Sequence, residues 1–469
     1  AAATLTAHYR EHREIEHRLQ MVNDAQTHAL PNSEEGMARI AAFLDCDLAV
    51  FESRLRDRLE EVHALTEDFF APDARAASKP SAATVGFDTE ITNQWRGYPA
   101  LRSTRAQEIF KRLMPGILER LSHTARPLEA LLAFDGFLKG LPAGVQLFSL
   151  FDANPQLIDL LIDIVGSSPA LSAHLARNAG VFDAVIGGSF FAPWPQIAAL
   201  VSELTEVLGR EPDYEKKLDM ARKWAKEWHF RIGVHHLRGL IDAETSGREY
   251  AALAEAVLRG LWPVVVAQFA SKHGAMPGRG AVVLGMGSLG AERLNAGSDL
   301  DLIVIYDAAG VEMSEGRRPL PARTYYARLT QAMVTAVSAL MPEGRLYEID
   351  MRLRPSGTQG PVATSLVSFM DYQREHAWTW EHLALTRARA VAGSVEVAAE
   401  VEAFRQDVLG KGHDRTKVWA DVAEMRARIS AAKAPDGPWD TKIGAGRMQD
   451  IELMAQGAAL IAGTAARST

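Results

Sequence analysis

Two aspartates stand two residues apart where a β-branched run begins, as Asp299 and Asp301 of "SDLDLIVIYD". Side chains two positions apart in a strand point to the same face, so both carboxylates would face one way while Leu300 and Leu302 enter the core. Adjacent carboxylates are the oxygen ligands that Mg²⁺ prefers, and such metal sites handle phosphate groups. The spacing therefore predicts a divalent-metal site for phosphate chemistry.

A glycine-rich turn precedes the aspartates. In "AVVLGMGSLG" a short apolar strand runs into Gly287 and Ser288, and a short helix is expected to follow. The backbone N–H groups of such a turn, together with the serine hydroxyl, are suited to holding the terminal phosphates of a nucleotide. Ser298, directly before the first aspartate, is a further candidate for nucleotide binding.

A third segment, "EIDMRLR", alternates charged and apolar residues. The pattern predicts one strand with Glu348, Asp350, Arg352 and Arg354 on the same face. Asp350 would be a third metal ligand that also accepts the acceptor's proton, while the two arginines counter phosphate charge. Cross-strand salt bridges and a solvated strand face are the structural alternatives for these charges. Their combination with a Gly-Ser turn favours the catalytic interpretation.

The same stretch also spells G-x-G-x-x-G, with Gly285, Gly287 and Gly290 followed by Asp307. This is the outline of a dinucleotide-binding fingerprint, in which Asp307 would bind the ribose. The second strand of that fold is covered on both faces and should be almost wholly apolar. Here it would begin with two unpaired carboxylates, which are costly to bury. The pattern therefore favours nucleotidyl transfer over NAD binding.

Composition limits the class of protein. The chain has 469 residues, so two or more domains are expected, and Cys46 is its single cysteine, which is typical of a reducing compartment. A net charge of −8 disfavours a general nucleic-acid binder. No apolar run approaches the ~18 residues of a membrane span, and the first twenty residues do not resemble a signal peptide. We expect a cytoplasmic protein without nucleic-acid or membrane partners, and a piece of a longer chain.

The predicted fold class is α+β, mostly helical, with one small sheet between helical arms. Apolar residues at helical spacing over 8–22 and 34–70 predict a helical hairpin, and strand patterns occur only around "AVVLG", "DLDLIVIYD" and "RLYEIDMRLRP", with a helix over 325–341 between the last two. These patterns divide the chain into a helical tail, a linker rich in Ala, Ser and Pro, a central helical region, a catalytic domain and the start of a C-terminal helical domain: 1–70, 71–97, 98–275, 276–395 and 396–469.

Five further residues after the third strand carry predictions of their own. Trp378 and Trp380 are predicted to pack in the core, and His382 is predicted to be structural. Arg387 and Arg389 are equally plausible as phosphate contacts and as surface charges.

At these residues the chain resembles a known family. "GMGSLGAERLNAGSDLDLIVIYD", "RLRPSG" and "AWTWEHLALTRAR" are similar to the bacterial glutamine synthetase adenylyltransferases, which belong to the polymerase-β-like nucleotidyltransferases. "IEHRLQMVNDAQTHALP" resembles the helical tail of that family's first catalytic half, and "LPAGVQLFSLFDANPQLIDLLIDIVGSSPALSAHLARN" resembles its central region. The resemblance implies a polymerase-β-like sheet flanked by helical domains.

Members of this family carry two similar catalytic halves. The N-terminal half removes AMP from glutamine synthetase by phosphorolysis, and the C-terminal half transfers AMP from ATP to one of its tyrosines. "RPSG", "AWTWEH" and the central region before the sheet are similar to the C-terminal half. The resemblance thus implies an Mg²⁺-dependent adenylyltransferase that uses ATP, with PII protein and glutamine as regulators. A deadenylylating or other protein-directed nucleotidyltransferase, and a non-catalytic module responsive to PII, remain the alternatives.

Carried over residue by residue, the resemblance implies that Asp299, Asp301 and Asp350 are the metal ligands. Ser288 departs from the family, whose members often have lysine there, and this leaves open which side chain steadies the phosphates. Asp450 and Glu452 fall two apart on a predicted helix and do not share a face. The family has acidic residues there too, which suggests a position near the site.

Overall fold

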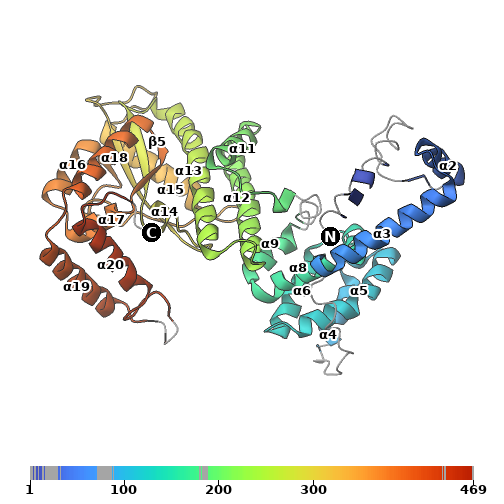
Figure 1. The fold of residues 1–469 in the computed structure, drawn as a ribbon. Helices are drawn as coiled ribbons and strands as arrows, with labels where there is room; N and C mark the ends of the chain where they lie inside the picture. Colours follow the sequence, from blue (N-terminus) through green and yellow to red (C-terminus); the bar gives the residue numbers. More distant parts are fainter. Residues whose placement is uncertain are drawn as a thin grey trace. The chain divides into compact units, whose positions relative to one another are not determined.

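The computed structural model describes residues 33–70, 89–178, 189–435 and 440–466, together with single positions among residues 4–31 and at 87, 181 and 437. Its two compact units are Ala1–Val85 and Gly86–Thr469 (Figure 1). The division falls inside the range 71–97 that the sequence predicts as a linker. Each unit is considered by itself below.

The first unit is helical. Two helices, α2 (Glu34–Phe43) and α3 (Leu48–Phe70), occupy the range predicted as one amphipathic run. They separate at a turn where Asp45 has a φ of 55°, a left-handed conformation that no helix continues through. Ile40 and Phe51 are buried on their apolar faces. Most of the helix predicted over 8–22 lies outside the described residues.

The second unit begins earlier than the predicted boundary at residue 98. Helix α4 (Thr89–Gln94) and the 3₁₀ turn η2 (Trp95–Gly97) lie within the range predicted as linker. Trp95 is buried, and its indole N–H donates to Asp135 at 2.9 Å. These residues therefore belong to the packed helical region, because an indole ring with a partner forty residues away cannot be part of a free linker.

Several helices of the central region start at a proline, which suits the first helical position because its missing N–H has no partner there in any case. Their apolar faces form one core that includes Phe134, Phe137 and Phe148. The helices and 3₁₀ turns of this region are η3 (Pro99–Leu101), α5 (Thr104–Ser122), α6 (Pro127–Gly140), α7 (Val145–Ala153), α8 (Pro155–Ser167), α9 (Pro169–Arg177) and η4 (Ser189–Phe191).

Three helices connect this region to the sheet: α11 (Ile197–Gly209), α12 (Tyr214–Leu237) and α13 (Ala243–His273). Among the described residues, α13 alone is long and apolar enough to cross a membrane. Two thirds of that apolar stretch, 67%, is buried inside the protein, against α11, α12 and the helix that follows β2. Packing in a core thus accounts for the apolar character of α13.

The sheet has five strands in mixed orientation. They are β1 (Gly280–Gly285), β2 (Leu300–Asp307), β3 (Ile349–Asp350), β4 (Ala363–Ser365) and β5 (Arg389–Gly393). The order is β3-β2-β1-β5, and β4 also pairs with β2. β1 runs antiparallel to β2 and β5, whereas β3 and β4 run parallel to β2. An antiparallel β1–β2 pair is incompatible with the parallel βαβ unit of a dinucleotide-binding fold.

The two central strands alternate between two cores, as their period-two pattern requires. Val283 and Val304 face a core shared with α13 and α15 (Ala322–Ser338), whereas Val282 and Ile303 face α16 (Leu366–Glu375) and α18 (Val395–Gly410). Figure 1 shows α13 and α18 on opposite sides of the sheet. The remaining helices are α14 (Gly287–Gly290), α17 (Thr379–Leu385), α19 (Arg415–Ala432) and α20 (Met448–Ile461), with the 3₁₀ turn η5 (Gly357–Gln359). The predicted class, α+β and mostly helical, is confirmed.

Candidate active site

The glycine turn after β1 lies directly against one of the two paired aspartates. Gly287 has a φ of 51°, and a Cβ at this position would stand 2.3 Å from Asp301 Oδ2. The Met286 N–H also donates to the Asp301 carbonyl oxygen at 2.8 Å. The turn and the aspartate are thus fixed to each other, and glycine is required because any side chain would displace the carboxylate.

The three predicted aspartates come together at one end of the sheet. Asp301 and Asp350 are partners in the parallel register of β2 and β3, and Asp299 directly precedes β2. Burial, followed by repulsion from Asp299 and from Asp350, raises the pKa of Asp301 to about 6. The structure therefore gathers three carboxylates whose negative charges oppose one another, as the alternation in the sequence predicted.

Asp350 differs from Asp301 because it has a cation of its own. Its Oδ1 accepts from the Arg352 backbone N–H at 2.8 Å, and its Oδ2 accepts from Arg352 Nε at 2.7 Å. These hydrogen bonds hold the pKa of Asp350 below its usual range. Asp350 thus stays ionised through the neutral range, and the exposed Arg352 lies next to the carboxylates, as predicted.

The predicted third strand is wrong beyond Asp350. The chain leaves β3 after Asp350 and enters a series of turns, so Arg352 and Arg354 do not continue a strand face. The Arg354 guanidinium donates instead to the carbonyl oxygens of Met351, Thr358 and Gly360, at 2.8, 3.2 and 3.2 Å. Arg354 therefore organises the loop after β3, and its predicted role in nucleotide binding has no support from its contacts.

The two candidate serines lie in the two turns that precede the aspartates in the chain. Ser288 is half-buried in α14, beside the Gly287 turn, and no hydrogen bond ties its hydroxyl to another described residue. Ser298 Oγ accepts from the Asn295 N–H at 3.1 Å and so closes the turn that leads into Asp299. Phosphate binding by either serine stays a prediction. The Ser288 hydroxyl has no hydrogen-bond partner among the described residues, whereas the Ser298 hydroxyl has one.

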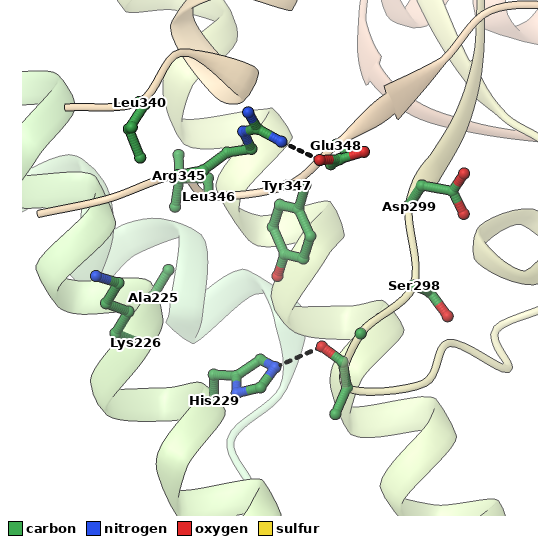
Figure 2. A pocket seen from close by; sticks show the side chains of 12 residues that line it. Ala225, Lys226, His229, Ser298, Asp299, Leu340, Arg345, Leu346, Tyr347 and Glu348 are labelled. Carbon is green, nitrogen blue, oxygen red and sulfur yellow. Dashed lines mark hydrogen bonds and ion pairs between the residues drawn. The ribbon is translucent and has the colours of Figure 1, made fainter. Parts of the chain in front are cut away.

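A cavity of about 570 Å³ lies beside Asp299, between α12 and the segment that enters β3. Figure 2 shows Lys226 and His229 on one wall and Ser298 and Asp299 on the other, with Tyr347 between them. The His229 ring N–H donates to the Ala296 carbonyl oxygen at 2.9 Å, which attaches α12 to the loop before β2. The cavity therefore adjoins the loop that positions Asp299.

Comparison with known proteins agrees with this geometry. The family model described as glutamate-ammonia ligase adenylyltransferase matches residues 158–404, which include the Gly287 turn and all three aspartates. The chain belongs to this family. A second model, GlnD PII-uridylyltransferase, matches residues 1–70.

Curated relatives in this adenylyltransferase family extend the similarity along the chain. Bifunctional glutamine synthetase adenylyltransferase/adenylyl-removing enzymes of Mesorhizobium japonicum, Brucella melitensis and Agrobacterium fabrum are 41%, 40% and 38% identical, over 95%, 96% and 98% of the chain. The matched regions are 48%, 48% and 49% of those relatives. The chain thus spans about half the length of the relatives that it matches.

The carboxylates beside the Gly287 turn are oxygen donors of the kind that a divalent cation prefers. Burial, and then the neighbouring carboxylates, raise the pKa of Asp301, so a cation between the carboxylates would relieve repulsion that Arg352 and Lys442 offset only in part. Yet within the described ranges no three Asp, Glu, His or Cys side chains stand ready as a metal-binding group. The ion pair of Asp350 with Arg352 gives a reason, since it directs this carboxylate to the arginine.

Two predictions for the segment before β5 need correction. Trp378 is 68% exposed, so it is not a core residue, whereas Trp380 is half-buried. Arg387 and Arg389 are not surface charges: Arg387 is buried and pairs with Glu452 at 3.2 Å, and Arg389 pairs with the fully buried Glu255. Both arginines already have carboxylate partners and are therefore poor candidates for phosphate contacts.

Lys442 is a further candidate residue that the sequence patterns of the sheet did not indicate. This exposed lysine is among the charges that act on the Asp301 carboxyl, although it lies far from the sheet in the sequence. A local signal existed, because "KIGAGR" places a lysine in a glycine-rich turn just before helix α20. The prediction ended the catalytic domain at residue 395 and so did not connect this turn with the aspartates.

Proposed function

We propose that the chain transfers AMP from ATP to a tyrosine hydroxyl of glutamine synthetase and releases pyrophosphate. The observation that carries this proposal is the group of three carboxylates beside the Gly287 turn, in a chain of the adenylyltransferase family. The curated relatives are named for glutamine synthetase adenylylation and for adenylyl removal. Asp299, Asp301 and Asp350 would hold Mg²⁺, which supplies positive charge to the phosphates when bound.

The residues of the chain then have distinct roles. The Gly287–Ser288 turn holds the terminal phosphates and leaves the α-phosphate over the carboxylates. The tyrosine oxygen forms a bond to the α-phosphorus as the bond to the bridging oxygen breaks and pyrophosphate leaves. The phenol has an ordinary pKa of about 10, so a carboxylate must take its proton. We assign this step to Asp350, because β3 is an edge strand that an acceptor can approach.

Regulation by glutamine is a second part of the proposal. The cavity beside Asp299 has both cations and carboxylates in its lining, as a free amino acid requires. Lys226 on α12 and the ion pair of Arg345 with Glu348 supply these charges. We expect Lys226→Met to weaken any effect of glutamine on transfer without changing the affinity for ATP. Control by PII protein and a cytoplasmic location are proposed from the family resemblance and from composition.

The test of the transfer reaction uses the 469-residue chain with α-labelled ATP, Mg²⁺ and glutamine synthetase. Label is expected on the acceptor, and the double variant Asp299→Asn, Asp301→Asn should lose nearly all of it. Asp371→Asn, an exposed aspartate on α16, is the matched control and should retain transfer. Absence of transfer by the unmodified chain, or equal transfer by the double variant, would refute the proposal. Release of AMP from adenylylated acceptor by phosphate would instead identify the deadenylylating alternative.

A further inference from the structure

The loop of residues 440–447 is linked to α14, the helix that begins at the Gly287 turn, by a chain of three contacts. The carbonyl oxygens of Thr441 and Lys442 accept from the first N–H groups of α20, at 3.2 and 3.1 Å. Further along α20, Glu452 pairs with Arg387 at 3.2 Å. The Arg387 carbonyl oxygen lies so near α14 that a Cβ on Gly290 would stand 2.0 Å from it. The loop is therefore attached to the helix that begins at the Gly287 turn.

The loop is also built to keep one conformation. Asp440 Oδ1 accepts from the backbone N–H groups of Lys442 and Ile443, at 2.8 and 2.9 Å. Asp450 Oδ2 accepts from the Gly446 N–H at 2.7 Å, and Arg426 binds both oxygens of the same carboxylate. Gly444 has a φ of 128°, which a residue with a side chain rarely adopts. The backbone around Lys442 is thus ordered before any ligand binds.

Four arginines in and around the site already have partners within the protein. Arg352 binds Asp350, Arg354 binds backbone carbonyls, and Arg387 and Arg389 bind carboxylates, as described above. Lys442 is exposed, and no ion pair links it to any described residue. It nevertheless lies near enough to act on the charge of Asp301. A nucleotide triphosphate brings several negative charges to a site that already holds three carboxylates, so it needs a cation that is not already paired.

We propose that Lys442 binds the phosphates of ATP across from the Gly287–Ser288 turn and neutralises the departing pyrophosphate. The loop of residues 440–447 would thereby add an unpaired cation to a site in which the residues of the sheet supply mainly carboxylates. Ser288 has no charge, and the proposed cation enters from the other side of the nucleotide. The inference deepens the proposed function and rests on it only for the identity of the reaction, because phosphate binding is measurable without an acceptor.

The experiment compares Lys442→Met and Lys442→Arg with Lys433→Met, an exposed lysine just after α19 that serves as the matched control. Binding of ATP and of pyrophosphate is measured by calorimetry with Mg²⁺, and binding of AMP is measured in parallel. Lys442→Met should weaken ATP and pyrophosphate binding by about tenfold or more, as loss of a charge-assisted contact does, while AMP binding and the melting temperature stay unchanged. Lys442→Arg should restore most of the affinity, and Lys433→Met should match the unmodified chain.

The outcomes separate this inference from the proposed function. Equal pyrophosphate and ATP affinities in Lys442→Met and the unmodified chain would overturn the role of Lys442, even if AMP transfer to glutamine synthetase is intact. An equal loss of AMP binding would also overturn it, because the lysine would then act on the nucleoside or on the fold. If the unmodified chain binds ATP through Lys442 but labels no glutamine synthetase, the inference stands and the proposed acceptor is wrong.

Discussion

At the scale of single residues, Gly287 is the position where the site tolerates least change. Its positive φ and its 2.3 Å approach to Asp301 Oδ2 leave no room for a methyl group. Gly287→Ala should therefore displace the Asp301 carboxylate and lower AMP transfer by at least about tenfold, because misplacement of a metal-binding group is costly in phosphoryl transfer. Transfer of α-labelled AMP measures the loss, and circular dichroism should show an intact fold.

Gly297 provides a matched control in the loop that leads to the aspartates. A Cβ on Gly297 would meet no atom within 4 Å, and its φ is not in the left-handed region. Gly297→Ala should accordingly retain transfer. If both alanine variants keep full activity, the close approach of Gly287 to Asp301 is not required for AMP transfer.

The raised pKa of Asp301 predicts a pH-dependent effect on stability. Its folded pKa of about 6 exceeds the ordinary value of 3.8, so its protonated form stabilises the fold below about pH 4, and this contribution is lost as the pH rises through 6. Asp301→Asn, which carries no charge, should melt higher than the unmodified chain at pH 7.5, by roughly 2 °C, and not at pH 4. Thermal unfolding in EDTA measures the difference, and an equal difference at both pH values would contradict the assigned cause.

The residues of the site were predictable from the sequence only where chemistry followed local spacing. Asp299, Asp301 and Asp350 were predicted as metal ligands from their two-residue alternation. The structure pairs Asp301 with Asp350 and places Asp299 just before β2, while their role as metal ligands stays a prediction. Arg387, Arg389 and Lys442 were misread or overlooked, because their partners and neighbours are remote in sequence. Glu255, for example, lies on α13, which precedes the sheet. No local pattern signals such pairings.

At the scale of elements, one buried arginine joins helix α12 to the connection between α15 and β3. Arg222 is fully buried, and its guanidinium donates to the carbonyl oxygens of Ala336, Ala339 and Gly344, at 2.8, 3.0 and 2.8 Å. These carbonyls lie at and beyond the end of α15, where the backbone has no helical partners of its own. Arg222 therefore holds the segment that leads to Asp350.

Arg222→Met should leave these buried carbonyl oxygens without donors and reduce the free energy of unfolding by about 3 kcal/mol or more. Urea unfolding monitored by tryptophan fluorescence measures the change. Arg222→Lys should recover little, because an ammonium group cannot reproduce the planar fork of the guanidinium. Full stability in Arg222→Met would show that water or neighbouring groups satisfy the same carbonyls.

The elements themselves were predictable where their patterns were long. β1 and β2 follow their apolar and alternating runs, and the helix expected over 325–341 occurs as α15. β3 is shorter than its charge alternation predicted because the chain turns soon after Asp350, with Ser356 at a φ of 60°. The four charged residues still alternate in the sequence, but the residues after Asp350 make no strand hydrogen bonds. The order of the strands, with β4 and β3 on the same side of β2, has no counterpart in local sequence.

At the scale of the whole molecule, the chain contains two units, and only the larger one contains the candidate site. The carboxylate site, the Gly287 turn and Lys442 all lie in the unit Gly86–Thr469. The unit Ala1–Val85 matches a different family model and has a small core of its own. The stretch rich in Ala, Ser and Pro that was predicted as a linker over 71–97 contains the division between the units, but Trp95 within it is packed and bonded to Asp135, a pairing that no local pattern indicates.

Since the two units have separate cores, removal of residues 1–85 should leave the larger unit intact. The shortened chain, residues 86–469, is expected to bind ATP with the affinity of the full chain and to keep its main unfolding transition within about 2 °C, because its hydrophobic cores are formed by its own residues. Differential scanning calorimetry and ATP titration measure both quantities. A large loss of ATP affinity with an unchanged transition would mean that the smaller unit contributes to the nucleotide site. A lowered transition would instead mean that the units stabilise each other, and the carboxylate site would then depend on the whole chain.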